Sequence, residues 1–325
     1  MKKFASILTA AAVAVSAMTF TASAEGGSLV VLGDSITSGY GLDGYTAGDN
    51  TSAADSFANR LAAGYQDYSN FAVDGRTSAE LLTALDDADV AAALAGADTI
   101  VISIGGNDFL QPMITALMTA AMQDPDIMNL MSSGADVSED DYAELFQKLA
   151  ETVLEAAKTV DTSAVVENIT EIFAKLGNAA PEAQVIILTV YDPFEGVTGM
   201  EMFDVVAREK LAELNSGITE TATAYGADVV DVFAAFKGHA LDYTNIASMD
   251  IHPNRDGHAV IYSMLSDIAE ATSVPASGAA GSDGGNSTAS NVQKGSPDTG
   301  AEGVAVFAGI AALAGAGILV SRRRK

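Results

Sequence analysis

Five short apolar segments, separated by longer segments with helical spacing, most constrain the fold of this 325-residue chain. Residues 28–32 form a continuous apolar run that ends at a glycine, as expected of a parallel strand buried on both faces. The other expected strands are 68–73, 99–104, 184–191 and 228–233, and the expected helices are 79–94, 200–225 and 258–271. Strands that alternate with helices predict an α/β fold with a parallel sheet covered on both faces.

The segment between the third and fourth expected strands carries helical spacing instead of a strand pattern. Its apolar residues recur as Tyr142, Leu145, Phe146, Leu149 and Val153, and again as Val165, Ile169, Ile172, Phe173 and Leu176. A helical insert over about 110–178 is therefore expected after the third strand. The methionines ahead of these helices, at 113, 118, 122, 128 and 131, fit ordinary core filling or a flexible apolar lining for an acyl chain.

Residues 1–24 have the pattern of a secretory signal peptide. Lys2 and Lys3 precede an apolar run over 4–20, and Ala22-Ser23-Ala24 forms an A-x-A cleavage site. The run is short and contains Ser and Thr, which favours a cleaved signal over a first transmembrane helix. We therefore expect signal peptidase to release a mature chain that begins at Glu25.

The C-terminus carries a second targeting pattern. Residues 274–295 are rich in Gly, Ser, Ala and Asn and predict a flexible spacer. Residues 296–325 contain the pentapeptide Ser-Pro-Asp-Thr-Gly, an apolar helix over 304–320 and a basic tail. The apolar helix is just long enough to span a bilayer, and the basic tail favours the cytoplasmic side. This order resembles a sortase sorting signal, with Ser in place of the familiar leading Leu.

The sorting signal implies a tethered protein. By this resemblance a sortase cleaves between Thr299 and Gly300 and joins Thr299 to the peptidoglycan of a Gram-positive wall. The alternative is an uncleaved anchor in the membrane. Both leave a globular domain over 25–273 outside the cell.

Charge and cysteine content exclude several classes of function. The net charge is −27 and there is no cysteine. A field of this sign repels polyanions, which excludes nucleic acid as a partner and favours neutral or cationic substrates. No disulfide or cysteine nucleophile can form. No cofactor or metal is expected, because Asp124, Asp126 and the acidic residues of 136–141 lack EF-hand spacing and predict a solvated loop.

Three motifs follow directly on expected strands, at the sheet edge where open α/β folds bind ligands. Gly33-Asp34-Ser35-Ile36 presents a serine at a strand-to-helix turn that Gly33 makes tight. Gly75-Arg76-Thr77 lies in the loop after the second strand. In Gly105-Gly106-Asn107-Asp108, after the third, a side-chain amide can stabilise an oxyanion or cap a helix. Each motif alone is also an ordinary turn sequence.

The chain has only three histidines, and one of them lies beside a carboxylate. His252 occurs in Asp250-Ile251-His252-Pro253, and its imidazole is suited to proton transfer near neutral pH. His258 falls on the buried face of the last expected helix, which favours a structural role. His239 is expected at the surface.

The order of these motifs resembles the SGNH, or GDSL-like, hydrolase family, whose four characteristic residues match Ser35, Gly75, Asn107 and His252. The resemblance covers residues 28–270 and is strongest to the lipase/acylhydrolase branch of Gram-positive bacteria. It implies a flavodoxin-like three-layer sandwich with a five-stranded parallel sheet. No Gly-x-Ser-x-Gly sequence occurs, which disfavours an ordinary α/β-hydrolase.

The resemblance also implies catalytic roles. Ser35 is then the nucleophile and His252 its general base and acid. The N–H groups of Ser35 and Gly75, together with the amide of Asn107, form the oxyanion hole. Asp250 supports His252 from two residues away, where the family has the acid three residues before the histidine. The alternative is a dyad helped by a backbone carbonyl.

Four further residues support these groups in the same scheme. Asp34 braces the nucleophile turn without proton chemistry, and Gly33, Gly105 and Asp108 shape the motifs around it. We expect hydrolysis of a lipid acyl ester, a lysophospholipid or a similar small neutral ester. The alternatives are a carbohydrate O-deacetylase acting on acetyl-xylan or wall polysaccharide, and a non-catalytic surface binding module. A monomer is assumed.

Overall fold

The computed structural model describes residues 27–125, 139–198, 200–248 and 250–272. Its centre is a five-stranded sheet with the order β2-β1-β3-β4-β5, in which every neighbouring pair is parallel. The strands are β1 Ser28–Gly33, β2 Asp67–Asn70, β3 Thr99–Ser103, β4 Gln184–Leu188 and β5 Asp228–Val230. The predicted five-stranded α/β fold is therefore confirmed. The predicted signal peptide, spacer and sorting signal lie outside the described residues.

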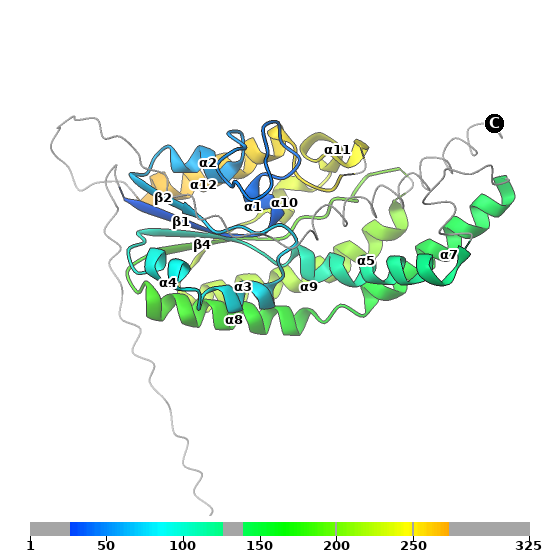
Figure 1. Cartoon of the computed structure of the whole chain (residues 1–325), viewed down its shortest axis with the longest axis horizontal. Coiled ribbons are helices and arrows are strands. Elements are labelled where there is room, and N and C mark those ends of the chain that lie inside the picture. The colour runs from blue at the N-terminus through cyan, green and yellow to red at the C-terminus, as the bar shows by residue number, and fades with distance from the viewer. Residues whose placement is uncertain (1–26, 126–138, 199, 249, 273–325) are drawn as a thin grey trace, which may run out of the picture.

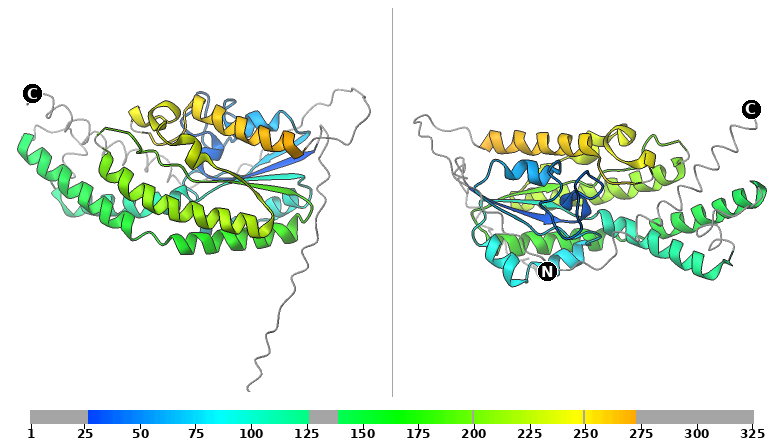
Figure 2. Two further views of the ribbon diagram at one scale, coloured as in Figure 1. Left: turned by 180° about the vertical axis from the view of Figure 1, so that it is seen from behind. Right: turned by 45° about the horizontal axis from the view of Figure 1, so that its top comes forward.

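Helices cover both faces of the sheet (Figure 1). One layer consists of α1 Ser35–Ser38, α2 Phe57–Ala62, α10 Val232–Phe236, α11 Ala240–Tyr243 and α12 Arg255–Thr272, with the short helix η1 Ile246–Ser248. The other consists of α3 Ser78–Ala84, α4 Ala88–Leu94, α8 Thr162–Ala179 and α9 Glu201–Tyr225. Two further helices, α5 Gly106–Gln123 and α7 Glu139–Lys158, pack against each other and extend past the end of the sheet (Figure 2).

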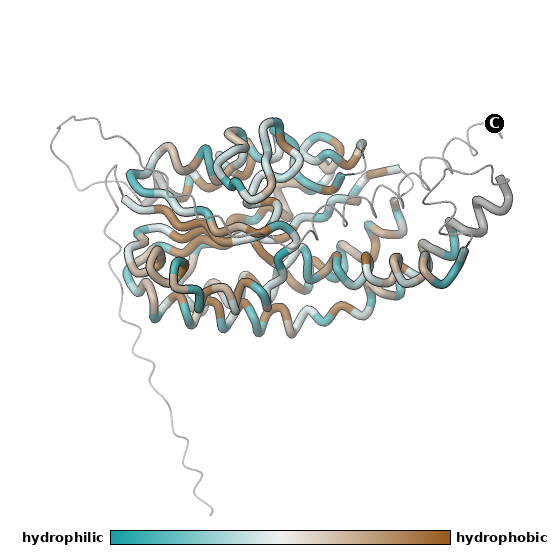
Figure 3. The backbone as a smooth tube through the Cα atoms, in the orientation of Figure 1, coloured by the Kyte–Doolittle hydropathy of each residue, from teal (hydrophilic) through white to brown (hydrophobic). Residues whose placement is uncertain are grey.

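The strand sequences explain why both faces are covered. Side chains alternate along a strand, so Val30 and Leu32 of β1 join the core under α3, α4, α8 and α9. Leu29 and Val31 join the core under α2 and α12 on the opposite face. The strands consequently form an apolar band through the middle of the molecule (Figure 3). A continuous apolar run is what a strand buried on both faces requires.

Three strands end three residues earlier than the apolar pattern predicts, and β3 ends one residue earlier, at Ser103. The expected segments 68–73, 184–191 and 228–233 end in the structure at Asn70, Leu188 and Val230. In β5 the reason is a helix cap: the side chain of Asp231 accepts a hydrogen bond from the N–H of Ala234 at 3.1 Å and starts α10. The apolar pattern continues past the ends of the strands because the loops that follow also contribute buried side chains.

The expected helix over 79–94 is two helices. Asp87 has extended backbone geometry and occupies the N-cap of α4, which separates α4 from α3. Leu81 and Leu85 from the first part, and Val90 and Leu94 from the second, remain buried in the same core. The apolar spacing is therefore the same on both sides of the break between α3 and α4. For this reason the periodicity of the sequence did not reveal the break.

The described residues of the segment predicted as an insert lie mostly in α5, α7 and α8, and these helices differ in where they pack. The apolar face of α8 lies in the central core against α3 and α9, so this helix belongs to the sandwich. Met113 on α5 is buried, whereas Met118 and Met122 are 40% and 77% exposed. Met128 and Met131 lie outside the described residues. None of the helices in the described ranges is long and apolar enough to cross a bilayer, and residues 304–320 fall outside those ranges.

A carboxyl group in the loop between β4 and α9, that of Asp192, lies close to the carboxyl of Asp204 in the first turn of α9. Asp192 is 5% exposed, and its Oδ1 accepts a hydrogen bond from the N–H of Phe194 at 2.8 Å. The other oxygen of Asp192, and Oδ1 of Asp204, are buried without a hydrogen-bond partner in the described structure. Burial raises the pKa of Asp192 to about 7, and the neighbouring carboxyls of Asp204 and Glu195 act in the same direction. The folded protein therefore retains a proton here that the unfolded chain loses at lower pH.

We expect Asp192→Asn to stabilise the protein at pH 8 and to have no such effect near pH 4. A raised folded-state pKa means that the contribution of Asp192 to stability is present below its unfolded pKa and is lost as the pH rises through 7. The amide also gives Asp204 a donor, for a gain on the order of 1 kcal/mol in the free energy of unfolding. Thermal unfolding of both proteins at the two pH values measures this. Glu209→Gln, which removes an exposed carboxylate of α9, is the control, and an equal gain at both pH values would contradict the assignment.

Gly33 ends β1 at a point where neighbouring atoms leave no room for a side chain. A Cβ on this residue would lie 2.2 Å from Oγ1 of Thr37 and 2.6 Å from the carbonyl oxygen of Ser103. The second atom belongs to the backbone of β3 and cannot rotate away. Glycine therefore allows the first turn of α1 to pack directly against the sheet.

Gly33→Ala should lower the free energy of unfolding by about 1–3 kcal/mol, because the added methyl group must displace α1 or β3. Gly177→Ala is the matched control: it lies within α8, where a Cβ would meet no atom within 4 Å. That change should raise stability by up to about 1 kcal/mol through helix propensity. Urea unfolding measures the free energy of unfolding of the two variants. Equal values for Gly33→Ala and Gly177→Ala would contradict this prediction.

Candidate active site

Ser35 lies at the carboxyl edge of the sheet, where β1 turns into a short helix. Asp34 is the N-cap of α1, and its Oδ1 accepts a hydrogen bond from the N–H of Ile36 at 3.0 Å. Ser35 is the first residue of this helix, which ends at Gly39 with a positive φ of 82°. The predicted strand-to-helix turn is present, and a side-chain cap holds it.

The structure brings Ser35, His252 and Asp250 into one chain of contacts. Nε2 of His252 lies 2.9 Å from Oγ of Ser35, and Nδ1 lies 2.5 Å from Oδ1 of Asp250. The same carboxylate oxygen accepts a hydrogen bond from the backbone N–H of His252 at 3.0 Å. A separation of two residues is therefore enough for the carboxylate to reach the imidazole of its own segment.

Asn107 and Gly75 flank the nucleophile turn on its other side. Asn107 lies in the first turn of α5, and its Nδ2 donates to Oδ2 of Asp34 at 3.3 Å and to the carbonyl oxygen of Arg76 at 3.1 Å. Gly75 has a φ of 76°, and its carbonyl oxygen accepts a hydrogen bond from Nε2 of Gln111 at 3.0 Å. Arg76 and Gln111 thus hold the two groups expected to form the oxyanion hole.

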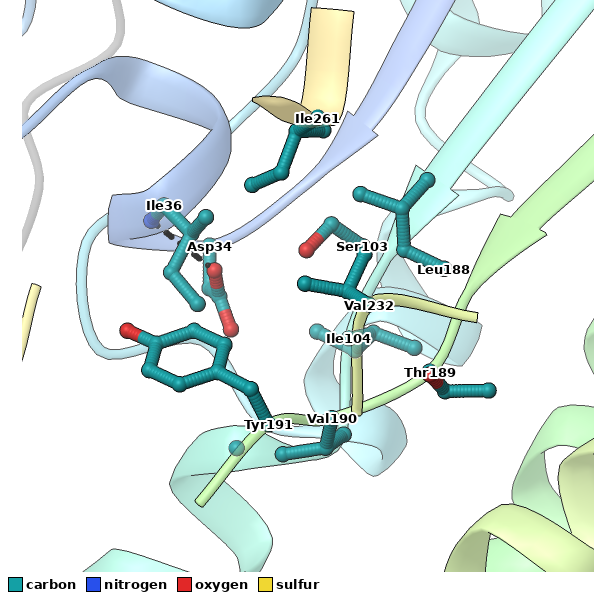
Figure 4. A pocket seen from close by; sticks show the side chains of 11 residues that line it. Asp34, Ile36, Ser103, Ile104, Leu188, Thr189, Val190, Tyr191, Val232 and Ile261 are labelled. Carbon is teal, nitrogen blue, oxygen red and sulfur yellow. Dashed lines mark hydrogen bonds between the residues drawn. The ribbon is translucent and has the colours of Figure 1, made fainter. Parts of the chain in front are cut away.

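Asp34 connects the nucleophile turn to Asn107. It is 2% exposed, and its carboxyl lines a small, mostly apolar pocket at the carboxyl ends of the strands, across from Tyr191 (Figure 4). Burial raises the pKa of Asp34 to about 7, against the opposing effects of the Ile36 N–H and of His252. Asp34 therefore bonds to the nucleophile turn on one side and to Asn107 on the other, and its bracing role stays a prediction.

Gly105 and Asp108 position the start of α5. Gly105 is the N-cap and adopts a φ of 109°, which favours glycine. The two oxygens of Asp108 accept hydrogen bonds from the N–H and the hydroxyl of Ser78 at 2.9 and 2.7 Å. These bonds join the first turn of α5 to the first turn of α3, so the loops after β2 and β3 are held together.

Three residues near the site were not predicted from the sequence. The ring of Tyr40 lies 4.5 Å from the imidazole of His252, centroid to centroid. The hydroxyl of Tyr191 donates to the carbonyl oxygen of Ile251 at 2.7 Å. Asp74 accepts hydrogen bonds from the hydroxyls of Ser38, at 2.6 Å, and Tyr45. No local pattern identifies these contacts, because each joins segments that meet only in the folded chain.

The other two histidines lie apart from Ser35. His258 is fully buried, stacks on Phe57 and accepts a hydrogen bond from the Phe57 N–H at 3.2 Å. Burial lowers the pKa of His258 to about 3, so the ring is neutral at pH 7. His239 is exposed and pairs with Asp242 at 3.0 Å. These positions agree with the structural and surface roles that the sequence indicated.

Acidic side chains near α5 do not assemble into a metal site in the part of the chain that the structure describes. No group of three or more His, Asp or Glu residues there is placed to hold a metal ion. Asp124 forms an ion pair with Lys148 at 2.5 Å. Asp126 and residues 136–138 lie outside the described ranges.

The sequence matches the GDSL-like Lipase/Acylhydrolase family over residues 31–260. This range contains Ser35, Gly75, Asn107 and His252, and therefore the whole of the arrangement described above. No curated protein sequence matches the chain.

Solved structures share the fold at low sequence identity. A lipase from a goat rumen metagenome superposes with a TM-score of 0.51 and 20% identity, over 76% of this chain and 97% of that chain. Phospholipase A1 from Streptomyces albidoflavus gives 0.52 and 20%, over 74% and 99%, and an extracellular lipase from Streptomyces rimosus gives 0.51 and 20%, over 74% and 99%. With the family match covering most of the folded chain, this protein belongs to the GDSL-like lipase/acylhydrolase family of ester-hydrolysing enzymes.

Proposed function

We propose that the protein hydrolyses carboxylic esters through an acyl-enzyme on Ser35. The observation that carries the proposal is the continuous contact from Oγ of Ser35 through the imidazole of His252 to the carboxylate of Asp250. A serine hydroxyl is a weak nucleophile at neutral pH, and an adjacent base oriented by a third group is what activates it. Here each of the three groups lies within hydrogen-bonding distance of the next.

In the proposed reaction, Ser35 attacks the ester carbonyl while Nε2 of His252 takes its proton. Asp250 holds the proton on Nδ1, so that Nε2 is free to accept, and its charge stabilises the imidazolium that forms. His252 then returns the proton to the leaving alcohol. A water molecule, deprotonated by the same imidazole, attacks the acyl-enzyme. The bond from the acyl carbon to Oγ then breaks, the imidazolium returns its proton to Oγ of Ser35, and the carboxylic acid leaves.

The oxyanion would be held by the N–H groups of Ser35 and Gly75 and by the amide of Asn107. One hydrogen of this amide is bonded to the Arg76 carbonyl, which keeps the group oriented. The other faces Asp34 at 3.3 Å, longer than the usual 2.9–3.0 Å, and is the one available to a developing negative charge. Loss of one such donor typically costs about 3 kcal/mol of transition-state stabilisation.

We propose a lipid acyl ester, lysophospholipid or similar neutral ester as the substrate. Helix α5 begins beside Asn107 and carries the exposed Met118 and Met122, four residues apart on one face. At 1.5 Å per residue, Met118 lies roughly 16 Å along the helix from Asn107, which suits a long acyl chain. The alternative is a carbohydrate O-deacetylase, for which an acetyl group needs no such apolar surface.

The proposed place of action is outside the cell membrane, on a tethered domain. The signal-peptide pattern of residues 1–24 supports export, and the pattern of residues 296–325 supports attachment to a Gram-positive wall by sortase. A strongly acidic domain is compatible with both. Attachment would keep the products of hydrolysis near the cell.

Ser35→Ala should abolish hydrolysis of short p-nitrophenyl esters, because it removes the hydroxyl that lies 2.9 Å from Nε2 of His252. The wild-type protein should react covalently with a fluorophosphonate probe and the variant should not. Ser38→Ala, which removes a neighbouring hydroxyl bonded to Asp74, is the control and should retain labelling. Activity that persists in Ser35→Ala would overturn the assignment.

Acyl length separates the two substrate classes. A lipid hydrolase should show a kcat/KM for p-nitrophenyl esters that extends to eight carbons or more, whereas a deacetylase should be most active on acetate. Replacing Met118 and Met122 together by Ser should reduce activity on the long esters and leave acetate hydrolysis unchanged. A maximum at acetate, with activity on acetyl-xylan, would favour the deacetylase.

A further inference from the structure

Although Asp250 lies only two residues before His252, it bonds to His252 through only one of its two carboxylate oxygens. Both hydrogen bonds from His252, one from the backbone N–H and one from Nδ1, end on Oδ1. An oxygen that accepts two bonds from its own segment aligns the imidazole only if the carboxylate itself cannot rotate. The second oxygen, Oδ2, lies beside Gly41 and the side chain of Asn245.

Asn245 lies at the base of the loop that carries Asp250 and His252. Its backbone N–H donates to the carbonyl oxygen of His252 at 2.9 Å, and its carbonyl oxygen accepts from the N–H of Asp250 at 3.3 Å. An isolated β-bridge between Thr244 and Pro253 closes the loop beside it. Asn245 therefore contacts the acid and the base of the proposed triad through its main chain.

The side chain of Asn245 hydrogen-bonds to the Asp250 carboxyl. A Cβ built on Gly41 would lie 2.9 Å from Oδ2 of Asp250 and 3.1 Å from Nδ2 of Asn245, so both atoms lie beside the same glycine. Gly41 has a φ of 84°, and its missing side chain lets both groups approach. Burial raises the pKa of Asp250, but hydrogen bonds from His252 and Asn245 outweigh it and hold this pKa below its usual value.

We infer that Asn245 is a positioning residue that holds the Asp250 carboxylate through Oδ2, so that Oδ1 stays aligned with Nδ1 of His252. This inference rests on the proposed function of Ser35 and His252. It explains how an acid only two residues before the histidine keeps its orientation: the support comes from Asn245, at the base of the same loop. The other titratable groups facing the pair are Asp34, Tyr40, Tyr191 and His258.

Asn245→Asp tests this with little change in shape. The variant replaces the donor by a second carboxylate, which repels Asp250 and favours protonation of the neighbouring imidazole. We expect kcat to fall about tenfold with KM nearly unchanged. The acidic limb of the kcat/KM profile should move to higher pH by about one unit. Asn178→Asp, which adds the same charge on the exposed surface of α8, is the matched control and should leave both unchanged.

A spectroscopic readout separates this inference from the proposed reaction. The proton on Nδ1 of His252 gives a downfield imidazole N–H resonance, which is assignable because the chain has three histidines. In Asn245→Ala this resonance should shift upfield or broaden. In Asn245→Asp the resonance should also change, both in the otherwise wild-type protein and in the Ser35→Ala variant. An unchanged resonance, with wild-type kcat and pH profile in Asn245→Asp, would overturn the role of Asn245. Full activity of Ser35→Ala would instead overturn the proposed function and leave the resonance as the test of Asn245.

Discussion

The hydrogen bond between Ser35 and His252 joins two loops that are 217 residues apart in the chain. It depends on the parallel sheet, which directs the carboxyl end of every strand to one edge. Because β1 lies between β2 and β3, the loop after each of its neighbours flanks Ser35. The register that pairs Gly33 with Ser103 sets the nucleophile turn beside the start of α5 and hence beside Asn107. From the opposite side, α12 packs on α2 and Tyr191 bonds to Ile251, which places His252 over Ser35.

Two carboxyl groups close to this bond have opposite electrostatic environments. Asp34 is buried with few donors, and its pKa is raised to about 7, whereas hydrogen bonds to Asp250 hold its pKa below the usual value. A carboxylate that must stabilise an imidazolium has to be charged, and one beside a developing oxyanion interferes least when it is neutral. The opposite pKa shifts of Asp34 and Asp250 are consistent with the different roles proposed for these two residues.

Local sequence patterns predicted the strands and the nucleophile turn, and they failed where a single side chain redirects the backbone. The apolar run before Gly33 is unambiguous because β1 is buried on both faces. The break at Asp87 and the end of β5 at Asp231 depend on helix caps, which an apolar pattern does not record. The sequence likewise suggested Asp250 as the partner of His252, but not whether its reach sufficed. That depends on a side-chain geometry that spacing alone does not specify.

By itself, the sequence determined which chemistry is available to this protein: a serine in a strand-end motif, a histidine with a nearby acid, no cysteine and a strongly negative charge. Those are properties of residue types and of their order, and folding does not alter them. Only the tertiary structure decided which groups meet, since Tyr40, Tyr191 and Asn245 come from separate loops with no shared pattern. It also decided the protonation preferences of Asp34 and Asp192, because desolvation depends on what surrounds a carboxyl in space and not along the chain.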